Sequence, residues 1–362
     1  MPDSWGRFAS HDELAVAFRH FAVRRCGDYA PLYARLGAGV AENRELLAIA
    51  ANATPGQSPP DLMLAAVHYL LAREPSHPLA RFYPTLASGA PATGDASGPF
   101  RSFCLDRREE LTRLISSRRV QTNEVRRCCY LLPAVMLAGQ LAAPRPLALI
   151  EAGASAGLNL SMDRYAYDYG TGRITGDRDS PLLLRCRLSG QTRPPLDLPV
   201  PAIASRAGID LNPLDPADPA DAAWLRALIW ADHLERALLL DDALRVAASR
   251  PPVPLHAGDA TGQLPAVVAA TPPGVAVCVI HTAFLAHLPP LQRDRFEHLV
   301  VLLSTAQPIY WVQAEPRRDP SEPRLRLTIC ENGCIREEWP LGHYQPHGGW
   351  LEWLATGVPA HA

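Results

Sequence analysis

The segment Gly153-Ala-Ser155-Ala-Gly157 follows a short apolar run at residues 147–151 and could support two different chemistries. Its letters fit the G-x-S-x-G turn that exposes a serine nucleophile between a strand and a helix. Small residues after a strand that ends in Glu151 also fit a loop that lets a nucleotide cofactor approach the backbone. Ser155 is therefore either a nucleophile or a small residue in a cofactor loop.

The serine hydrolase interpretation needs an acid and a histidine later in the chain. Asp259 precedes His281, His343 and His347, so the order alone permits a triad. However, the serine of such an enzyme normally follows an inner strand of a sheet that earlier strands have begun, and the preceding residues are helical in pattern. The only His-Gly-Gly segment, a candidate for the oxyanion site, begins at His347, downstream rather than upstream. The cofactor interpretation is favoured.

Two further acids follow apolar runs. Asp210 ends the run at 204–210, where a carboxylate can accept hydrogen bonds from ribose hydroxyls, and Asp259 ends the run at 253–259. Because the carboxyl ends of parallel strands meet at one edge of a sheet, Glu151, Asp210 and Asp259 are expected to face one crevice.

These motifs resemble those of class I methyltransferases that use S-adenosylmethionine. "EAGASAG" is similar to the E/D-x-G-x-G-x-G loop of that superfamily, and "GIDLNP" and "AGDA" are similar to the segments after its second and third strands. Ser155 stands where the superfamily has the middle glycine and would put a hydroxyl beside the cofactor. The resemblance covers residues 146–340. Together with "RRVQTNEV" and the helical front, these phrases also resemble, over nearly the whole chain, a bacterial family of unknown function built on this fold.

The resemblance implies a role for each matching residue. Glu151, Gly153 and Gly157 would lie at the methionine and sulfonium end of S-adenosylmethionine. Asp210 would lie on its ribose and Asp259 near its adenine. A metal site is not predicted.

Methyl transfer is an in-line displacement at a carbon activated by a sulfonium, so the protein mainly has to align two reactants and exclude water. A base is needed only when the acceptor holds its proton. His281, with Thr282, ends the fourth apolar run, where this fold presents residues to the substrate, and an imidazole titrates near neutral pH. His281 could equally be a hydrogen-bonded histidine at a strand end, and His287 is expected to be structural.

A polar group, Gln121-Thr122-Asn123-Glu124, lies between two helical segments. Gln121, Asn123 and Glu124 could fold over the pocket and contact the cofactor or the acceptor. Thr122 and Asn123 are also good N-cap residues, so a capping box explains the same letters and is slightly favoured. Tyr165 is a further candidate at the lid, although core packing is expected for it.

The 362 residues carry a formal net charge of -2, and 48% of them are hydrophobic, as in a globular protein without a basic surface for nucleic acid or anionic membranes. No apolar run reaches the length of a membrane span, and the start lacks the pattern of a signal peptide, so a cytoplasmic protein with a small-molecule substrate is expected. All 35 basic residues are arginine, which excludes a P-loop lysine or a pyridoxal phosphate lysine. The eight cysteines lack C-x-x-C spacing, which favours reduced thiols.

The spacing of apolar residues changes along the chain. From residue 12 to 141 they recur every three or four residues, which predicts helices. After residue 146, short apolar runs alternate with helical stretches, which predicts a doubly wound, Rossmann-like, mostly parallel sheet of seven strands. The last two runs meet at Asn332-Gly333, which predicts an antiparallel C-terminal hairpin.

We therefore predict a helical lid or substrate domain at 1–143 and a methyltransferase-like α/β domain at 144–362, with a β insertion at 168–200. The expected function is binding of S-adenosylmethionine and methyl transfer to a small molecule. Three alternatives stay open: a lyase or cyclase that uses S-adenosylmethionine otherwise, a binding module without transfer, and a hydrolase with Ser155 as nucleophile. An NAD-dependent enzyme is disfavoured by the terminal hairpin.

Overall fold

The computed structural model describes residues 8, 10–121, 124–315 and 321–356. They form two compact units, the first made of the described residues up to 121 with 218–241, and the second of 124–217 with 242–356. The two units are not divided between residues 143 and 144, where the sequence predicted a boundary. Residues 124–143 pack with the second unit, and 218–241 return to the first. Each unit therefore contains two separate stretches of the chain.

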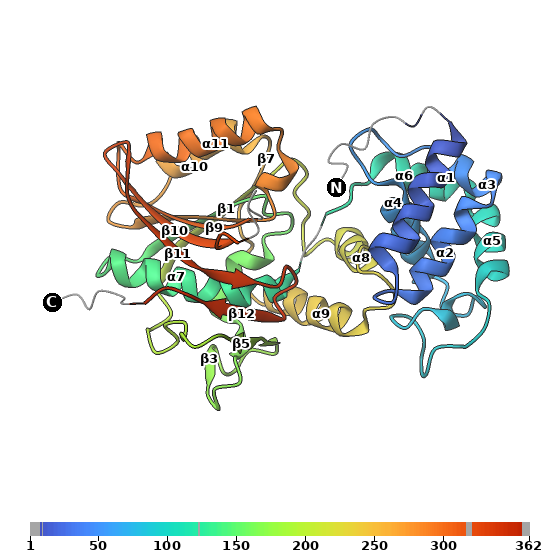
Figure 1. The fold of residues 1–362 in the computed structure, drawn as a ribbon, viewed down its shortest axis with the longest axis horizontal. Coiled ribbons are helices and arrows are strands. Elements are labelled where there is room, and N and C mark those ends of the chain that lie inside the picture. Colours follow the sequence, from blue (N-terminus) through green and yellow to red (C-terminus); the bar gives the residue numbers. More distant parts are fainter. Residues whose placement is uncertain (1–7, 9, 122–123, 316–320, 357–362) are drawn as a thin grey trace. The chain divides into compact units, whose positions relative to one another are not determined.

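The first unit is helical (Figure 1), and apolar side chains are buried between its helices. Its helices are α1 (His11–His20), α2 (Pro31–Ala41), α3 (Arg44–Ala50), α4 (Pro59–Leu71), α5 (Ser97–Asp106), α6 (Arg108–Ser117) and α8 (Pro219–Ala227), with a π-helical segment η1 (Phe21–Cys26) and a 3₁₀ turn η2 (Ala80–Phe82). Helix α2 has no side-chain cap from its own N-terminus. The carboxylate of Asp232 accepts hydrogen bonds from the amides of Leu32 and Tyr33 at 2.8 and 3.2 Å instead. Asp232 thus caps α2 from a distant part of the chain and attaches the segment 218–241 to this helix.

The second unit contains a nine-stranded sheet with the order β5-β12-β11-β10-β9-β8-β1-β6-β7. Its strands are β1 (Leu147–Ala152), β5 (Arg187–Ser189), β6 (Ile203–Asp210), β7 (Leu255–Ala257), β8 (Ala276–Thr282), β9 (Ile309–Ala314), β10 (Leu325–Glu331), β11 (Cys334–Tyr344) and β12 (Trp350–Trp353). Neighbouring strands from β7 to β9 are parallel, those from β9 to β12 are antiparallel, and β5 is parallel to β12. The protein thus has an α/β fold with a large, mostly parallel sheet.

The five apolar runs that predicted parallel strands, at 147–151, 204–210, 253–259, 275–281 and 308–313, correspond to β1, β6, β7, β8 and β9. Their ends are displaced by at most two residues. The C-terminal hairpin is confirmed, because β10 and β11 pair on either side of Asn332 and Gly333. Both turn residues have positive φ, 54° and 74°, as a two-residue hairpin turn requires. The sheet has nine strands rather than the predicted seven because β12 extends its edge and β5, from the predicted insertion, pairs with β12.

The rest of the insertion forms a small second sheet with the order β3-β2-β4. Its strands are β2 (Ala166–Asp168), β3 (Ile174–Gly176) and β4 (Leu183–Arg185), and β2 follows a 3₁₀ helix, η4 (Leu158–Arg164). Every residue of the central strand β8 is buried, as expected for a parallel strand with both faces covered.

Helices cover both faces of the main sheet. Helix α7 (Cys128–Ala142) packs on β8 to β10, while α10 (Ala260–Ala269) and α11 (Pro290–Leu303) lie on the opposite side (Figure 1). The remaining elements are η3 (Val125–Arg127), α9 (Leu234–Ala248) and η5 (Leu285–His287). Among the described residues, no helix combines the length and the apolarity that a membrane span needs.

Candidate functional site

The loop from β1 into η4 contains three residues with a left-handed backbone. The φ angles are 76° at Gly153, 52° at Ser155 and 69° at Gly157. Glycine adopts this conformation freely, whereas it costs about 1–2 kcal/mol at a residue such as Ser155. The amides of Gly153 and Ala154 both donate to the carbonyl of Ile209, at 2.8 and 3.1 Å. The loop is thereby held at the carboxyl end of β6.

Asp210, the last residue of β6, fastens the same loop with its side chain. One carboxylate oxygen accepts a hydrogen bond from the Ser155 amide at 2.8 Å, and the other accepts one from the Asn212 amide at 2.8 Å. Hydrogen bonds to an ionised acceptor are stronger than neutral ones. Asp210 therefore compensates for the strained backbone at Ser155, a role that its sequence position did not predict.

Glu151 lies near the end of β1 and is 1% exposed. Its Oε1 accepts a hydrogen bond from Asn159 Nδ2 at 2.8 Å, while Oε2 is buried without a hydrogen-bond partner among the described residues. Burial raises the pKa of Glu151 to about 8, although the Asn159 hydrogen bond and the charge of Arg127 act in the opposite direction. The carboxyl is therefore mostly protonated at pH 7 when no ligand is bound.

Arg127, the last residue of η3, brings a positive charge close enough to act on Glu151. Its Nη1 donates to the carbonyl of Thr282 at 3.4 Å. Its Nε is buried, and no described residue hydrogen-bonds to it. Tyr130 makes a 2.9 Å hydrogen bond between its hydroxyl and Thr282 Oγ1, and burial raises the pKa of this phenol. A buried carboxyl group and a guanidinium thus lie near one strand end, and each has one polar atom without a hydrogen-bond partner among the described residues.

His281 is fully buried, and its ring lies 5.7 to 5.8 Å from those of Phe284, Phe296 and Trp311. Its Nδ1 makes a 2.8 Å hydrogen bond to Oε1 of Glu315, which also accepts from the amides of Phe284 and Leu285. Burial alone would raise the pKa of Glu315, but the hydrogen bond and the charge of His281 hold it below its usual value. The pair therefore fixes the turn after β8, while Thr282 faces Tyr130.

Asp259 follows β7, whose end joins that of β6 through a 2.9 Å hydrogen bond from the Gly258 amide to the Asp210 carbonyl. Its carboxylate accepts a hydrogen bond from the Gly262 amide at 3.1 Å and caps α10. Since β1, β6 and β7 are parallel neighbours, the three predicted acids lie along the same edge of the sheet.

The candidate lid residues lie in different surroundings. Asn123 falls outside the described residues, and Gln121 is half-buried and belongs to the first unit. Glu124 is buried, and one of its carboxylate oxygens lies 3.3 Å from His347 Nδ1. Tyr165 is fully buried and donates to the Leu158 carbonyl at 2.6 Å, which is core packing next to η4.

Sequence reasoning missed Arg127, Asn159, Tyr130 and Glu315. The first three come from η3, η4 and α7, so only the folded chain brings them to the ends of β1 and β8. Glu315 directly follows β9, and its place after an apolar run is a signal that could have been used. The described residues contain no group of three or more histidine, cysteine, aspartate or glutamate side chains arranged to hold a metal ion.

Comparison with known proteins gives one family. The family model described as an uncharacterized protein conserved in bacteria (DUF2332) matches residues 15–353, and so includes residues of both units. No curated protein and no solved structure matches the chain.

Proposed function

The chain belongs to this bacterial family, DUF2332, and we propose that it binds S-adenosylmethionine and transfers its methyl group to a small molecule. The observation that carries the proposal is the placement of Glu151 and Arg127, two buried polar groups close enough for the charge of Arg127 to lower the pKa of Glu151. One buried carboxyl oxygen and one buried guanidinium nitrogen lack partners among the described residues. A ligand with an ammonium and a carboxylate on one carbon would satisfy both, since carboxylates bind ammonium groups and arginine binds carboxylates.

The strand arrangement supports a nucleotide-type ligand beside this pair. The parallel strands lie side by side in the order β7-β6-β1-β8-β9. If the insertion strand β5 is left out and the others are numbered along the chain, this order is 3-2-1-4-5. Rossmann-like sheets have this order, and their ligands bind outside the carboxyl ends of the strands where the order reverses. That point is the end of β1, where the loop with Gly153 and Ser155 begins. Asp210 and Asp259 are the proposed partners of the ribose and the adenine.

When bound, S-adenosylmethionine supplies a methyl group that its sulfonium has already activated. The chain then has to orient the ligand and exclude water. Glu151 and Arg127 would fix the amino acid end of the ligand, and Thr282 with Tyr130 would form the neighbouring wall. The raised pKa of Tyr130 makes its hydroxyl a hydrogen-bond donor rather than a base. His281 is a positioning residue in this proposal, because aromatic rings and Glu315 surround it.

A second candidate is a binding module without transfer. The burial of His281 favours it, because the one base predicted for the acceptor lies in an aromatic environment. The two candidates differ in one result. A transferase passes labelled methyl groups from S-adenosylmethionine to small molecules in a cell extract, whereas a binding module binds the ligand and does not consume it.

Calorimetric titration of the whole chain tests the proposed function. The probes are S-adenosylmethionine, 5′-methylthioadenosine, which lacks the amino acid end, and NAD. We expect S-adenosylmethionine to bind at least about tenfold more tightly than 5′-methylthioadenosine, and Arg127→Gln to abolish most of this difference. Arg178→Gln, on the exposed insertion, is the control and should change nothing. Equal affinity for the two sulfur ligands, or tighter binding of NAD, would contradict the proposal.

A further inference from the structure

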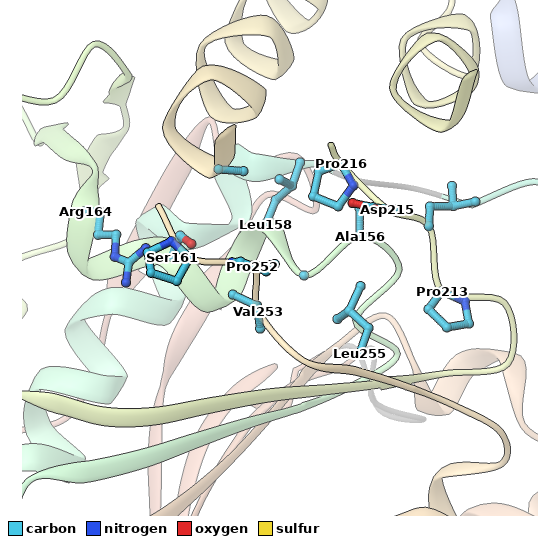
Figure 2. Close-up of a pocket in the computed structure, with 14 residues that line it drawn as sticks. Ala156, Leu158, Ser161, Arg164, Pro213, Asp215, Pro216, Pro252, Val253 and Leu255 are labelled. Atoms are coloured by element: carbon cyan, nitrogen blue, oxygen red, sulfur yellow. The ribbon is translucent and has the colours of Figure 1, made fainter. Parts of the chain in front are cut away.

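A pocket of about 320 Å³ lies within the second unit, between η4, the loop after β6 and the segment that leads into β7 (Figure 2). Its volume is at the lower end of the range of small-molecule sites. Glu151, Asp210 and Asp259 do not line it. The pocket is therefore separate from the Glu151 and Arg127 site, although Ala156 and Gly157 of the loop after β1 line it.

The body of the pocket is apolar and rigid. Pro213 and Pro216 line it from the loop after β6, and Pro251, Pro252 and Leu255 line it from the segment before and at the start of β7. Proline rings have a fixed φ and no backbone N–H, so they add no polar donor and little freedom. A wall of this kind is preformed, and an apolar ligand would lose little binding free energy in ordering it.

One end of the pocket is polar. Ser161 and Arg164 both line it from η4. Ser161 is 4% exposed, and within the described ranges its hydroxyl makes no hydrogen bond. The guanidinium of Arg164 likewise has no hydrogen bond or ion pair there. Figure 2 shows both side chains beside Pro252, at the end opposite Asp215.

The charges around this end are mainly positive. Asp163, the nearest acid in the chain, is paired with Arg206. Burial lowers the pKa of Arg164, and the charges of Arg206 and Arg250 lower it further, while Asp163 acts in the opposite direction. An anion on Arg164 would offset this repulsion and would accept the hydrogen bond that the Ser161 hydroxyl can donate.

We propose that this pocket binds a small carboxylic acid with an apolar body, its carboxylate on Arg164 and Ser161 and its body between the proline rings. The proposal goes beyond the proposed function and does not depend on it, because the pocket residues that carry it are absent from the Glu151 and Arg127 site. Binding should therefore occur without S-adenosylmethionine.

Fluorine NMR titration of the full chain with 4-fluorobenzoate tests the proposal, with 4-fluorobenzamide and 4-fluorobenzylamine as neutral and cationic probes. We expect saturable binding of the acid and at least about tenfold weaker binding of the other two. Arg164→Gln should weaken binding of the acid by at least about tenfold, and Ser161→Ala by a smaller factor. Arg164→Lys should retain most of the affinity. Arg250→Gln removes the charge of a nearby residue that does not line the pocket. It should therefore weaken binding of the acid by less than about threefold.

Amide shifts provide the second measurement, since they report the site even if one variant folds poorly. On addition of 4-fluorobenzoate to the wild type, the amides of Val253 and Leu255 should shift. Three results would overturn the proposal: no saturation up to about 10 mM acid, equal binding of acid and amide, or unchanged affinity in a folded Arg164→Gln variant.

Discussion

The backbone amide of Ser155 donates a 2.8 Å hydrogen bond to the carboxylate of Asp210, 55 residues later in the chain. The bond joins the loop after the first parallel strand to the end of the second. It also stabilises the one residue of the loop that has a left-handed backbone without being glycine. The shape of the candidate cofactor loop thus depends on an acid from a neighbouring strand.

Asp210→Asn should destabilise the second unit by about 1.5–3 kcal/mol, because an amide side chain cannot offer two ionised acceptors to two backbone N–H groups. Urea unfolding measures the change. Asp177→Asn is the control, since Asp177 accepts one amide hydrogen bond in an exposed turn and should change stability by less than about 0.5 kcal/mol. Equal effects of the two substitutions would contradict the assigned role of Asp210.

Gly348→Ala should destabilise the second unit and weaken ligand binding near Arg127. A Cβ at Gly348, where φ is 75°, would lie 2.1 Å from the carbonyl oxygen of Arg126, so η3 would have to shift. Gly274→Ala is a matched control with φ of 79° and no heavy atom within 4 Å of its added Cβ. Thermal unfolding should show that Gly348→Ala is less stable than Gly274→Ala by about 1–3 kcal/mol. Similar losses for both variants would mean that the approach to Arg126 is unimportant.

The sequence was sufficient to predict the parallel strands and the terminal hairpin, because buried parallel strands are continuous apolar runs and Asn332-Gly333 suits only a tight turn. It also predicted that Glu151, Asp210 and Asp259 would share an edge. It was insufficient for the boundary near 143. Helix α7 has the same apolar spacing as the helices before it, and only its packing on β8 to β10 assigns it to the second unit.

Glu151 should make the stability of the protein fall as pH rises from about 5 to 8. The folded pKa is about 8, against an ordinary value of 4.5. The folded chain therefore keeps a proton that the unfolded chain has released, and each pH unit in this window costs up to about 1.4 kcal/mol. Glu151→Gln cannot ionise and should lose less stability over the window. Parallel pH profiles of the two proteins would contradict the raised pKa.

His281→Gln should lower stability by about 3 kcal/mol, because buried Glu315 would lose the His281 hydrogen bond and the electrostatic interaction that keeps its pKa low. Chemical denaturation measures the loss. His287→Gln, at an exposed position in the next turn, should stay within about 0.5 kcal/mol of the wild type. If His281→Gln were as stable as His287→Gln, the pair with Glu315 would not fix the turn.

The strand-end position of His281 was compatible with catalysis, and sequence alone could not reveal its surroundings. Its aromatic neighbours come from β9, α11 and the turn that follows β8. Arg127 shows the opposite case, since nothing in its sequence position indicated a place in the site. Its position close to Glu151 arises from the packing of η3 against α7 and η4, and of α7 against the sheet.

Proton release on binding of S-adenosylmethionine tests the central claim most directly. The measurement is calorimetric titration at pH 6.5 in two buffers that differ in ionisation enthalpy. Glu151 is protonated at that pH and must lose its proton to bind the ligand's ammonium group, so the wild type should release about one proton per ligand. Glu151→Gln should release none and should bind at least about tenfold more weakly. Binding without proton release, with unchanged affinity in Glu151→Gln, would contradict the account.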